Sequence, residues 1–161
     1  MSTLFVYAHR GASAEAPENT LAAFRRALDA GADGIEMDVH LASDGVPVVI
    51  HDDTLERTTD GTGAVAAHRA AQLRALDAGS WFGPRFAGEP LPTLDEALRL
   101  LAGRLRINLE VKEARAGLAV LVLLPSFVGA EVVFSSFDVG LLADLRRSAP
   151  DLPLAVLQDS G

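Results

Sequence analysis

The sequence contains no cysteine and few basic residues. Without cysteine there are no disulfide bonds or thiolate metal sites, and the redox compartment is not constrained. Lysine and arginine total 14 against 22 aspartates and glutamates, which gives a net charge of −8 at pH 7. Non-specific binding to nucleic acid or to an anionic membrane needs a basic surface, so we expect neither.

Long hydrophobic runs are also missing. The longest, Leu118 to Leu124, is far too short to cross a bilayer, so no transmembrane segment is expected. The start, Met1 to His9, has no long apolar stretch behind a basic head, which argues against a secretory signal and favours a cytoplasmic protein. Hydrophobic residues nevertheless make up 49% of the chain, so we expect one globular domain over residues 1–161.

Strand and helix patterns alternate along most of the chain. Apolar runs typical of strands start near Leu4, Gly34, Ile107, Glu131 and Leu152, and the first of them predicts a buried strand over Leu4–Ala8. The predicted helices lie between Thr20 and Gly31, near 70–76, and over 93–101, 118–124 and 139–147. This alternation predicts an α/β fold with a parallel sheet of five strands joined by βαβ crossovers.

A sixth predicted strand, 46–50, is an exception because only a tight turn at Ser43-Asp44-Gly45 separates it from the strand before it. Parallel neighbours need a long crossover, so this strand must fold back antiparallel. If Asp44 and Gly45 are the two turn residues, the register places His51 directly opposite Asp38 and on the same face.

Residues 52–92 do not show the alternation of strand and helix patterns that the rest of the chain has. They hold several glycines and prolines and one short predicted helix. Because this stretch is too long for an ordinary loop, we expect it to form a small inserted subdomain.

Two of the predicted strands carry a wholly polar face opposite a wholly apolar one, because side chains alternate across a strand. The polar residues are Glu36, Asp38 and His40 in one strand and Asn108, Glu110 and Lys112 in the other. Strands of a parallel sheet are normally buried on both faces and apolar throughout, and a buried charge must be paired or bound to a metal.

Two interpretations of these polar faces are open. In one, such a strand lies at the edge of the sheet and shows its polar side to water. In the other, Glu36, Asp38 and Glu110 converge on a hard cation, and all-oxygen ligands suit Mg²⁺ or Ca²⁺ better than Zn²⁺. A divalent cation, histidines that transfer protons and basic side chains that hold phosphate oxygens together suit phosphoryl transfer.

A series of short motifs runs in order over nearly the whole chain. They are His9-Arg10-Gly11, Pro17-Glu18-Asn19-Thr20, Glu36-Met37-Asp38-Val39, Asp44-Gly45, His51-Asp52, Leu76 to Phe82, Pro92-Thr93-Leu94, Glu110-Val111-Lys112 and Ser135 to Asp138. Together they are highly specific, and they resemble the signature of the glycerophosphodiester phosphodiesterase family. The stretches 76–82 and 92–94 resemble the inserted subdomain of that family.

The resemblance implies a (β/α)₈ TIM barrel and metal-dependent hydrolysis of glycerophosphodiesters to glycerol 3-phosphate and an alcohol. The implied metal ligands are Glu36, Asp38 and Glu110, the implied general acid/base pair is His9 and His51, and the implied phosphate contacts are Arg10 and Lys112. For His51, metal ligation is an alternative role. Glu18 and Asn19 would brace the first loop, and for Asn19 a helix cap is an equal alternative.

The chain departs from the family in its number of strands. A barrel of this type has eight strands in about 250 residues, whereas about five are predicted here. The barrel would then be incomplete, with its first and last strands as open edges that a homodimer could cover. The short stretch 114–129 also predicts a stunted helix after the 107–112 strand.

Three functions follow from these observations. The first is an active phosphodiesterase that binds a small glycerophosphodiester, and the second is a non-catalytic truncated remnant or part of an assembly. The third is a related phospholipase or sphingomyelinase, and both Pro17–Thr20 and the inserted subdomain favour the glycerophosphodiester branch over it. The sequence identifies neither the alcohol leaving group nor the metal.

Overall fold

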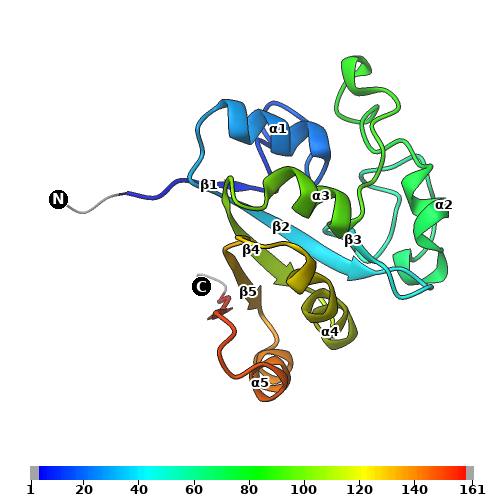
Figure 1. Ribbon diagram of the computed structural model, residues 1–161. Coiled ribbons are helices and arrows are strands. Elements are labelled where there is room, and N and C mark those ends of the chain that lie inside the picture. Colours follow the sequence, from blue (N-terminus) through cyan, green and yellow to red (C-terminus); the bar gives the residue numbers. More distant parts are fainter. Residues whose placement is uncertain (1–3, 159–161) are drawn as a thin grey trace.

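The computed structural model describes residues 4–158 and is built around one β-sheet (Figure 1). Its strands are β1 (Tyr7–His9), β2 (Gly34–Leu41), β3 (Pro47–Val49), β4 (Arg106–Val111), β5 (Val132–Ser136) and β6 (Leu154–Val156). Five of them run parallel in the order β1-β2-β4-β5-β6, and β3 pairs antiparallel with β2. The predicted α/β fold with five parallel strands is confirmed.

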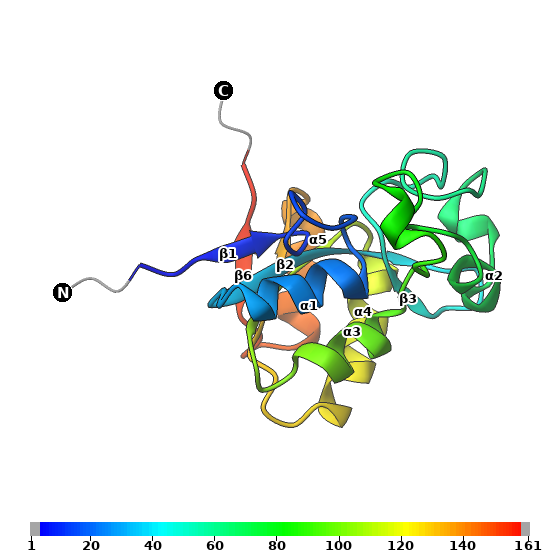
Figure 2. The same ribbon diagram turned by 90° about the horizontal axis from the view of Figure 1, so that it is seen from above.

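Helices fill the connections between the strands. They are α1 (Leu21–Asp29), α2 (Ala70–Arg74), α3 (Leu94–Leu101), α4 (Ala114–Leu123) and α5 (Val139–Ser148), with 3₁₀ turns at Val65–Ala67, Pro84–Phe86 and Leu124–Ser126. Figure 2 shows α1, α3 and α4 on the same side of the sheet. None of the helices within residues 4–158 is long and apolar enough to cross a lipid bilayer.

Two threonines explain where α1 and α3 begin. The Thr20 side chain accepts a hydrogen bond from the backbone N–H of Ala23, and Thr93 forms a capping box with Glu96. Such caps satisfy amide groups that the first turn of a helix leaves without a partner. Because Thr20 is the cap of α1, the helix-cap alternative for Asn19 is wrong.

The helix after β4 is longer than predicted. α4 has 10 residues and starts at Ala114 instead of at position 118. Its first turn contains Ala114, Arg115 and Ala116, which favour helix, and the side chain of the N-cap residue Glu113 makes no capping hydrogen bond. The expectation of a stunted helix is therefore wrong.

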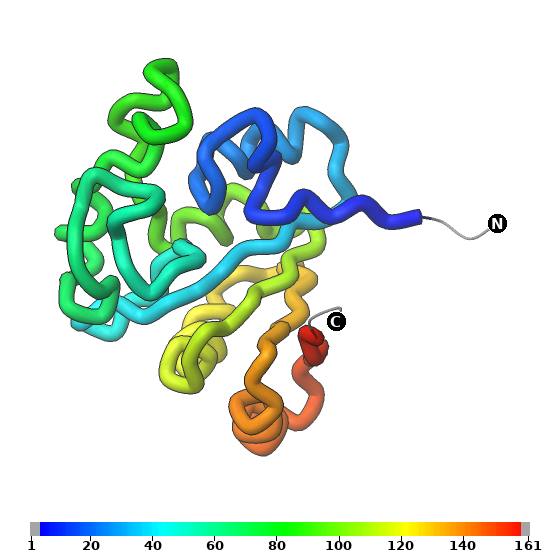
Figure 3. The backbone as a smooth tube through the Cα atoms, turned by 180° about the vertical axis from the view of Figure 1, so that it is seen from behind, coloured from blue at the N-terminus to red at the C-terminus, as the bar shows by residue number. Residues whose placement is uncertain are grey.

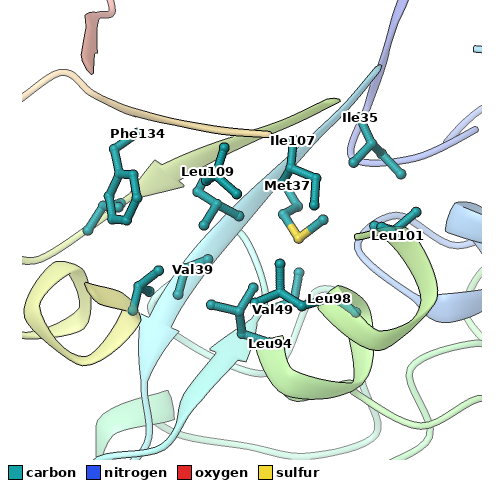
Figure 4. Packing of buried hydrophobic residues seen from close by; sticks show 14 of the residues in the cluster. Ile35, Met37, Val39, Val49, Leu94, Leu98, Leu101, Ile107, Leu109 and Phe134 are labelled. Carbon is teal, nitrogen blue, oxygen red and sulfur yellow. The ribbon is translucent and has the colours of Figure 1, made fainter. Parts of the chain in front are cut away.

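The apolar faces of β2 and β4 form the main core. The buried residues on these faces are Ile35, Met37, Val39, Ile107, Leu109 and Val111. They belong to one cluster with residues of α1, α3, α4 and α5, among them Phe24, Leu98, Val120 and Leu145, and Figure 4 shows part of it. Because all four helices pack on this face, the polar side chains of β2 and β4 point to the opposite face of the sheet.

The β2–β3 hairpin differs from the prediction by one residue. Its loop has three residues, Ser43 to Gly45, and Gly45 takes a left-handed φ of +81°. Ile50 therefore lies opposite Asp38, and its backbone N–H donates to the Asp38 carbonyl at 3.1 Å. The predicted two-residue turn, which placed His51 there, is wrong, because a three-residue loop that ends in a left-handed glycine is the other common hairpin solution.

The first strand is shorter and more exposed than predicted. β1 starts at Tyr7, and the residues before it are exposed, with Leu4 at 83% and Val6 at 56%. Within residues 4–158, β1 pairs only with β2 and lies at an edge of the sheet. The expected buried strand over Leu4–Ala8 is wrong, since an edge strand with one neighbour buries less of its apolar surface.

Residues 52–92 lie beside the β2–β3 hairpin, at the carboxyl end of β2 (Figure 3). A second cluster of buried apolar residues forms there, and it includes Leu55, Val65, Leu73 and Leu91. Ile50, just after β3, belongs to the same cluster. This segment therefore packs around its own small core, which is joined to the sheet through the hairpin.

Candidate active site

The predicted site residues lie on the polar face of the sheet and near the carboxyl ends of its strands. In the strand register His9 is the partner of Glu36, and Asp38 is the partner of Glu110. β2 is thus the central strand of the site, with β1 and β4 on either side. The carboxyl ends of parallel strands are where α/β barrels and open sheets hold their sites.

Glu36, Asp38 and Glu110 bring their carboxylates together. One oxygen atom from each lies within 4.8 Å of the other two. Asp38 is fully buried, and Glu36 is only 9% exposed. Both β2 and β4 are interior strands of the sheet, so the alternative of a polar face at a sheet edge is wrong.

The surroundings act differently on the two most buried carboxyls. Burial raises the pKa of Glu36 to about 7, and the negative charges of Asp38 and Glu110 add to this effect. Burial also disfavours the ionised form of Asp38, but the Lys112 ammonium and the Asn19 amide outweigh it and lower the pKa of Asp38. The positive charges near Glu36 therefore do not offset its burial, and its carboxyl group ionises at a higher pH than that of an ordinary glutamate.

Two basic side chains border the acidic cluster. Lys112 Nζ lies 2.8 Å from Asp38 Oδ1 and also forms an ion pair with Glu110. Arg10 Nε lies 3.3 Å from Asp38 Oδ2, and the Arg10 backbone N–H donates to Glu36 Oε2 at 3.0 Å. Both predicted phosphate contacts are thus within reach of a molecule that binds at the cluster.

The loop before α1 is held against the site by two side chains. Asn19 Nδ2 donates to Asp38 Oδ2 at 2.8 Å, and Glu18 Oε1 accepts from the Arg10 guanidinium at 2.9 Å. Arg10 and Asn19 both have a φ of +57°, in the left-handed region that is uncommon outside glycine. The contacts of Glu18 and Asn19 agree with the bracing role that the resemblance implies.

The two histidines lie near different parts of the cluster. His9 Nε2 is 3.7 Å from Glu36 Oε2, and the His9 side chain is 69% exposed. His51 follows β3, and its Nδ1 lies 2.6 Å from Asp52 Oδ1. The charge of a protonated His51 is one of the influences that lower the pKa of Asp38, so His51 is close to the cluster despite the shifted hairpin register.

Arg57 also belongs to this group of contacts, and no sequence pattern singles it out. Its guanidinium donates to both Asp52 and Glu18. Arg57 lies in the irregular segment after β3, where neither a strand period nor a helix period predicts the direction of a side chain. Its proximity to Asp52 in the sequence is the only signal, and a weak one.

The residues of the cluster fit a divalent cation. Besides the three converging carboxylates, Asn108 Oδ1 is buried and accepts no hydrogen bond from the described part of the chain. Carboxylate and amide oxygens are the ligands that Mg²⁺ and Ca²⁺ prefer. Asn108 shares the polar face of β4 with Glu110, and a cation at the cluster would give its side-chain oxygen a partner.

Comparisons with known proteins agree on one family. Residues 9–161 match the Glycerophosphoryl diester phosphodiesterase family. The chain is 42% identical over 174 residues to the glycerophosphodiester phosphodiesterase of Caldanaerobacter subterraneus subsp. tengcongensis. That match covers 100% of this chain and 69% of the relative.

Two solved structures share the fold. A phosphodiesterase of Oleispira antarctica, in complex with the product sn-glycerol-3-phosphate, matches with a TM-score of 0.90 and 38% identity over 95% of this chain and 65% of that one. A glycerophosphodiester phosphodiesterase of Agrobacterium tumefaciens matches with a TM-score of 0.87 and 40% identity, over 94% and 66%. The chain thus spans about two thirds of the length of these relatives.

The motifs, the strand order and these matches lead to the same assignment. Five parallel strands with helices on one face form an incomplete (β/α)₈ TIM barrel, as predicted. The match over 9–161 includes the strands that carry the acidic cluster and the histidine at the end of β1. The chain belongs to the Glycerophosphoryl diester phosphodiesterase family.

Proposed function

We propose that this chain hydrolyses glycerophosphodiesters to glycerol 3-phosphate and an alcohol, with Mg²⁺ or Ca²⁺ as cofactor. The observation that carries the proposal is the convergence of three carboxylate oxygens within 4.8 Å, beside basic side chains and a histidine. Membership of the family supports a phosphodiester substrate. The product bound to the Oleispira antarctica relative supports glycerol 3-phosphate.

Glu36, Asp38 and Glu110 would hold the cation. When bound, a divalent cation neutralises phosphate charge and polarises a phosphoryl oxygen. Arg10 and Lys112 would donate N–H groups to the phosphate oxygens and so orient the diester. Both side chains already contact Asp38, which keeps them beside the place where the phosphate would lie.

His9 and His51 would transfer the protons, because an imidazole can give or take a proton near neutral pH. One neutral imidazole takes a proton from the attacking water as the water oxygen bonds to phosphorus. The other ring, protonated, gives its proton to the alcohol oxygen as the bond between that oxygen and phosphorus breaks. The hydroxyl group of the water thereby becomes part of glycerol 3-phosphate, and a proton is added to the alcohol.

We also propose that residues 52–92 act as an inserted subdomain within a single domain. Their own apolar cluster supports this division. The segment supplies Asp52 and Arg57 to the contacts around His51, so it would take part in the site as well as in the fold.

Release of glycerol 3-phosphate from glycerophosphocholine tests the proposed function. We expect turnover with Mg²⁺ or Ca²⁺ and none in EDTA. His9→Ala and His51→Ala should each lose about 10²- to 10⁴-fold in rate, the usual contribution of a positioned acid or base. His68→Ala is the control, because the His68 ring is hydrogen-bonded to the Ala64 carbonyl of its own segment, so this variant should keep wild-type turnover.

Two results would contradict this function. A chain that releases no product with either metal would favour the alternative of a non-catalytic part of an assembly. Cleavage of sphingomyelin in preference to glycerophosphocholine would favour the related phospholipase or sphingomyelinase branch.

A further inference from the structure

We propose that Arg57 is a positioning residue, which fixes the hydrogen on His51 Nδ1 through Asp52 and holds Arg10 in place through Glu18. The inference rests on the proposed function for its effect on turnover. It concerns a residue of the irregular segment that follows β3, outside the strands that carry the acidic cluster.

Arg57 binds two carboxylates at once. Its Nε donates to Asp52 Oδ2 at 2.6 Å and its Nη2 to Asp52 Oδ1 at 2.9 Å. The same Nη2 donates to Glu18 Oε1 at 2.9 Å, and Nη1 donates to Glu18 Oε2 at 3.0 Å. Paired contacts of this kind fix direction as well as distance, because the guanidinium is planar and its donors are rigid.

The first carboxylate determines which nitrogen of His51 carries the hydrogen. The Arg57 hydrogen bond is the largest of the influences that lower the pKa of Asp52, so this carboxylate stays ionised. An ionised carboxylate only accepts hydrogen bonds, and His51 Nδ1 lies 2.6 Å from it, so Nδ1 must be the donor. His51 Nε2 is then left as the nitrogen that can take or give a proton.

The second carboxylate connects Arg57 to the acidic cluster. Glu18 Oε1 also accepts from Arg10 Nη1 at 2.9 Å, so one oxygen is shared by the two arginines. Arg10 Nε in turn lies 3.3 Å from Asp38 Oδ2. A continuous series of contacts therefore runs from His51 through Arg57 to the proposed phosphate contact and a proposed metal ligand.

A purely structural role predicts something different. The Arg57 side chain is 45% exposed, and exposed ion pairs contribute little to stability. If Arg57 served only as a surface ion pair between two loops, its loss would leave the His51 ring and the chemical step unchanged. Arg74, which is 54% exposed and pairs with Glu96, is such a surface ion pair and provides the matched control.

The test compares Arg57→Met with Arg74→Met in the full chain. Nitrogen-15 NMR of the imidazole rings reports which nitrogen carries the hydrogen, at a pH well above the ordinary histidine pKa of about 6.5. His51→Asn identifies the His51 signals among the four histidines. We expect His51 to be protonated at Nδ1 in the wild type and in Arg74→Met, and to populate both tautomers in Arg57→Met.

Turnover gives the second readout. We expect kcat of Arg57→Met to fall by about 10- to 100-fold, the usual loss when an outer hydrogen-bond partner that supports a site histidine is removed, while Arg74→Met keeps its rate. If Arg57→Met does not fold, Arg57→Lys replaces it, since lysine keeps the charge but cannot make the paired contacts. The same partial loss of the Nδ1–H tautomer is expected there.

Wild-type tautomers and wild-type kcat in the folded Arg57 variant would overturn the inference. The NMR readout separates this failure from a failure of the proposed function. A wild-type chain without turnover would contradict the proposed function, while the tautomer of His51 would still decide the role of Arg57.

Discussion

Glu36 is a residue of the site whose burial lowers the stability of the folded chain when its carboxyl group is ionised. Its pKa is raised to about 7 because burial and the charges of Asp38 and Glu110 disfavour the ionised form, whereas an ordinary glutamate titrates near 4.5. The folded chain therefore holds this proton more tightly than the unfolded chain does. A divalent cation would take the place of the proton, so metal binding should release protons near neutral pH.

The first prediction concerns the pH dependence of stability without metal. The contribution of Glu36 to the free energy of unfolding is fully present below pH 4.5 and is lost as the pH rises to about 7. The loss amounts to at most about 3 kcal/mol. Urea unfolding in EDTA at a series of pH values measures it, and Glu36→Gln should remove this part of the slope.

Glu131→Gln is the control for that series, since the Glu131 side chain is 72% exposed. It should leave the slope as in the wild type. A slope in Glu36→Gln that equals the wild-type slope would show that Glu36 titrates like an ordinary glutamate in the folded chain.

The residues of the site could be predicted only where a strand fixes the direction of a side chain. The two-residue period placed Glu36, Asp38 and Glu110 on polar faces, and the structure brings their oxygen atoms together. Arg57 could not be found in this way, because its position depends on the packing of an irregular segment. His51 was selected by a predicted register that the structure does not have, although it does lie near Asp38.

At the scale of elements, local chemistry decided which boundaries could be predicted. α1 and α3 begin where a threonine caps them, at Thr20 and Thr93. α4 follows Glu113, whose side chain makes no capping hydrogen bond, and its start was predicted four residues too late. In the β2–β3 hairpin, the Asp-Gly pair indicated the turn correctly, but Gly45 is the last residue of a three-residue loop.

The second prediction concerns this hairpin. Gly45 has a φ of +81°, and an added Cβ would meet no atom within 4 Å, so Gly45→Ala tests backbone conformation alone. We expect a loss of about 1–2 kcal/mol in the free energy of unfolding, the cost of the left-handed region for an L-residue. Urea unfolding at one pH measures the loss.

Gly83→Ala serves as the control for the hairpin. Gly83 has a φ of 168°, which is extended backbone open to any residue, and an added Cβ there also meets nothing within 4 Å. It should unfold like the wild type within about 0.5 kcal/mol. Equal stability of Gly45→Ala and Gly83→Ala would contradict the left-handed conformation of the loop.

At the scale of the whole molecule, the sheet has one face covered by helices and one that holds the site. The order of strands and helices was enough to predict the parallel direction of the five strands, because βαβ crossovers fix that direction. Within residues 4–158, β1 and β6 each pair with one strand only. Apolar side chains on and beside these strands are exposed, with Val6 at 56% and Val156 at 53%.

The third prediction is that this chain associates in solution, and we propose a homodimer that covers the edges of β1 and β6. Strand edges with unpaired N–H and C=O groups favour pairing with another chain. Light scattering after size exclusion should give a mass of two chains or more. Val6→Lys and Val156→Lys should shift the mass toward one chain, because charged residues at an edge oppose pairing.

A third lysine variant, Val122→Lys, is the control. Val122 lies on α4, away from both edge strands, and is 82% exposed, so this change should leave the mass as in the wild type. A monodisperse monomer in the wild type would contradict the proposed dimer and show that five strands are stable alone.

Calorimetric titration with Ca²⁺ or Mg²⁺ measures directly whether the three carboxylates on two neighbouring strands form one metal site. We expect the wild-type chain to bind one cation, and Glu36→Gln and Glu110→Gln each to bind it at least about tenfold more weakly. Glu131→Gln should bind like the wild type. Wild-type affinity in both Glu36→Gln and Glu110→Gln, or no binding by the wild-type chain, would contradict a metal site at these carboxylates.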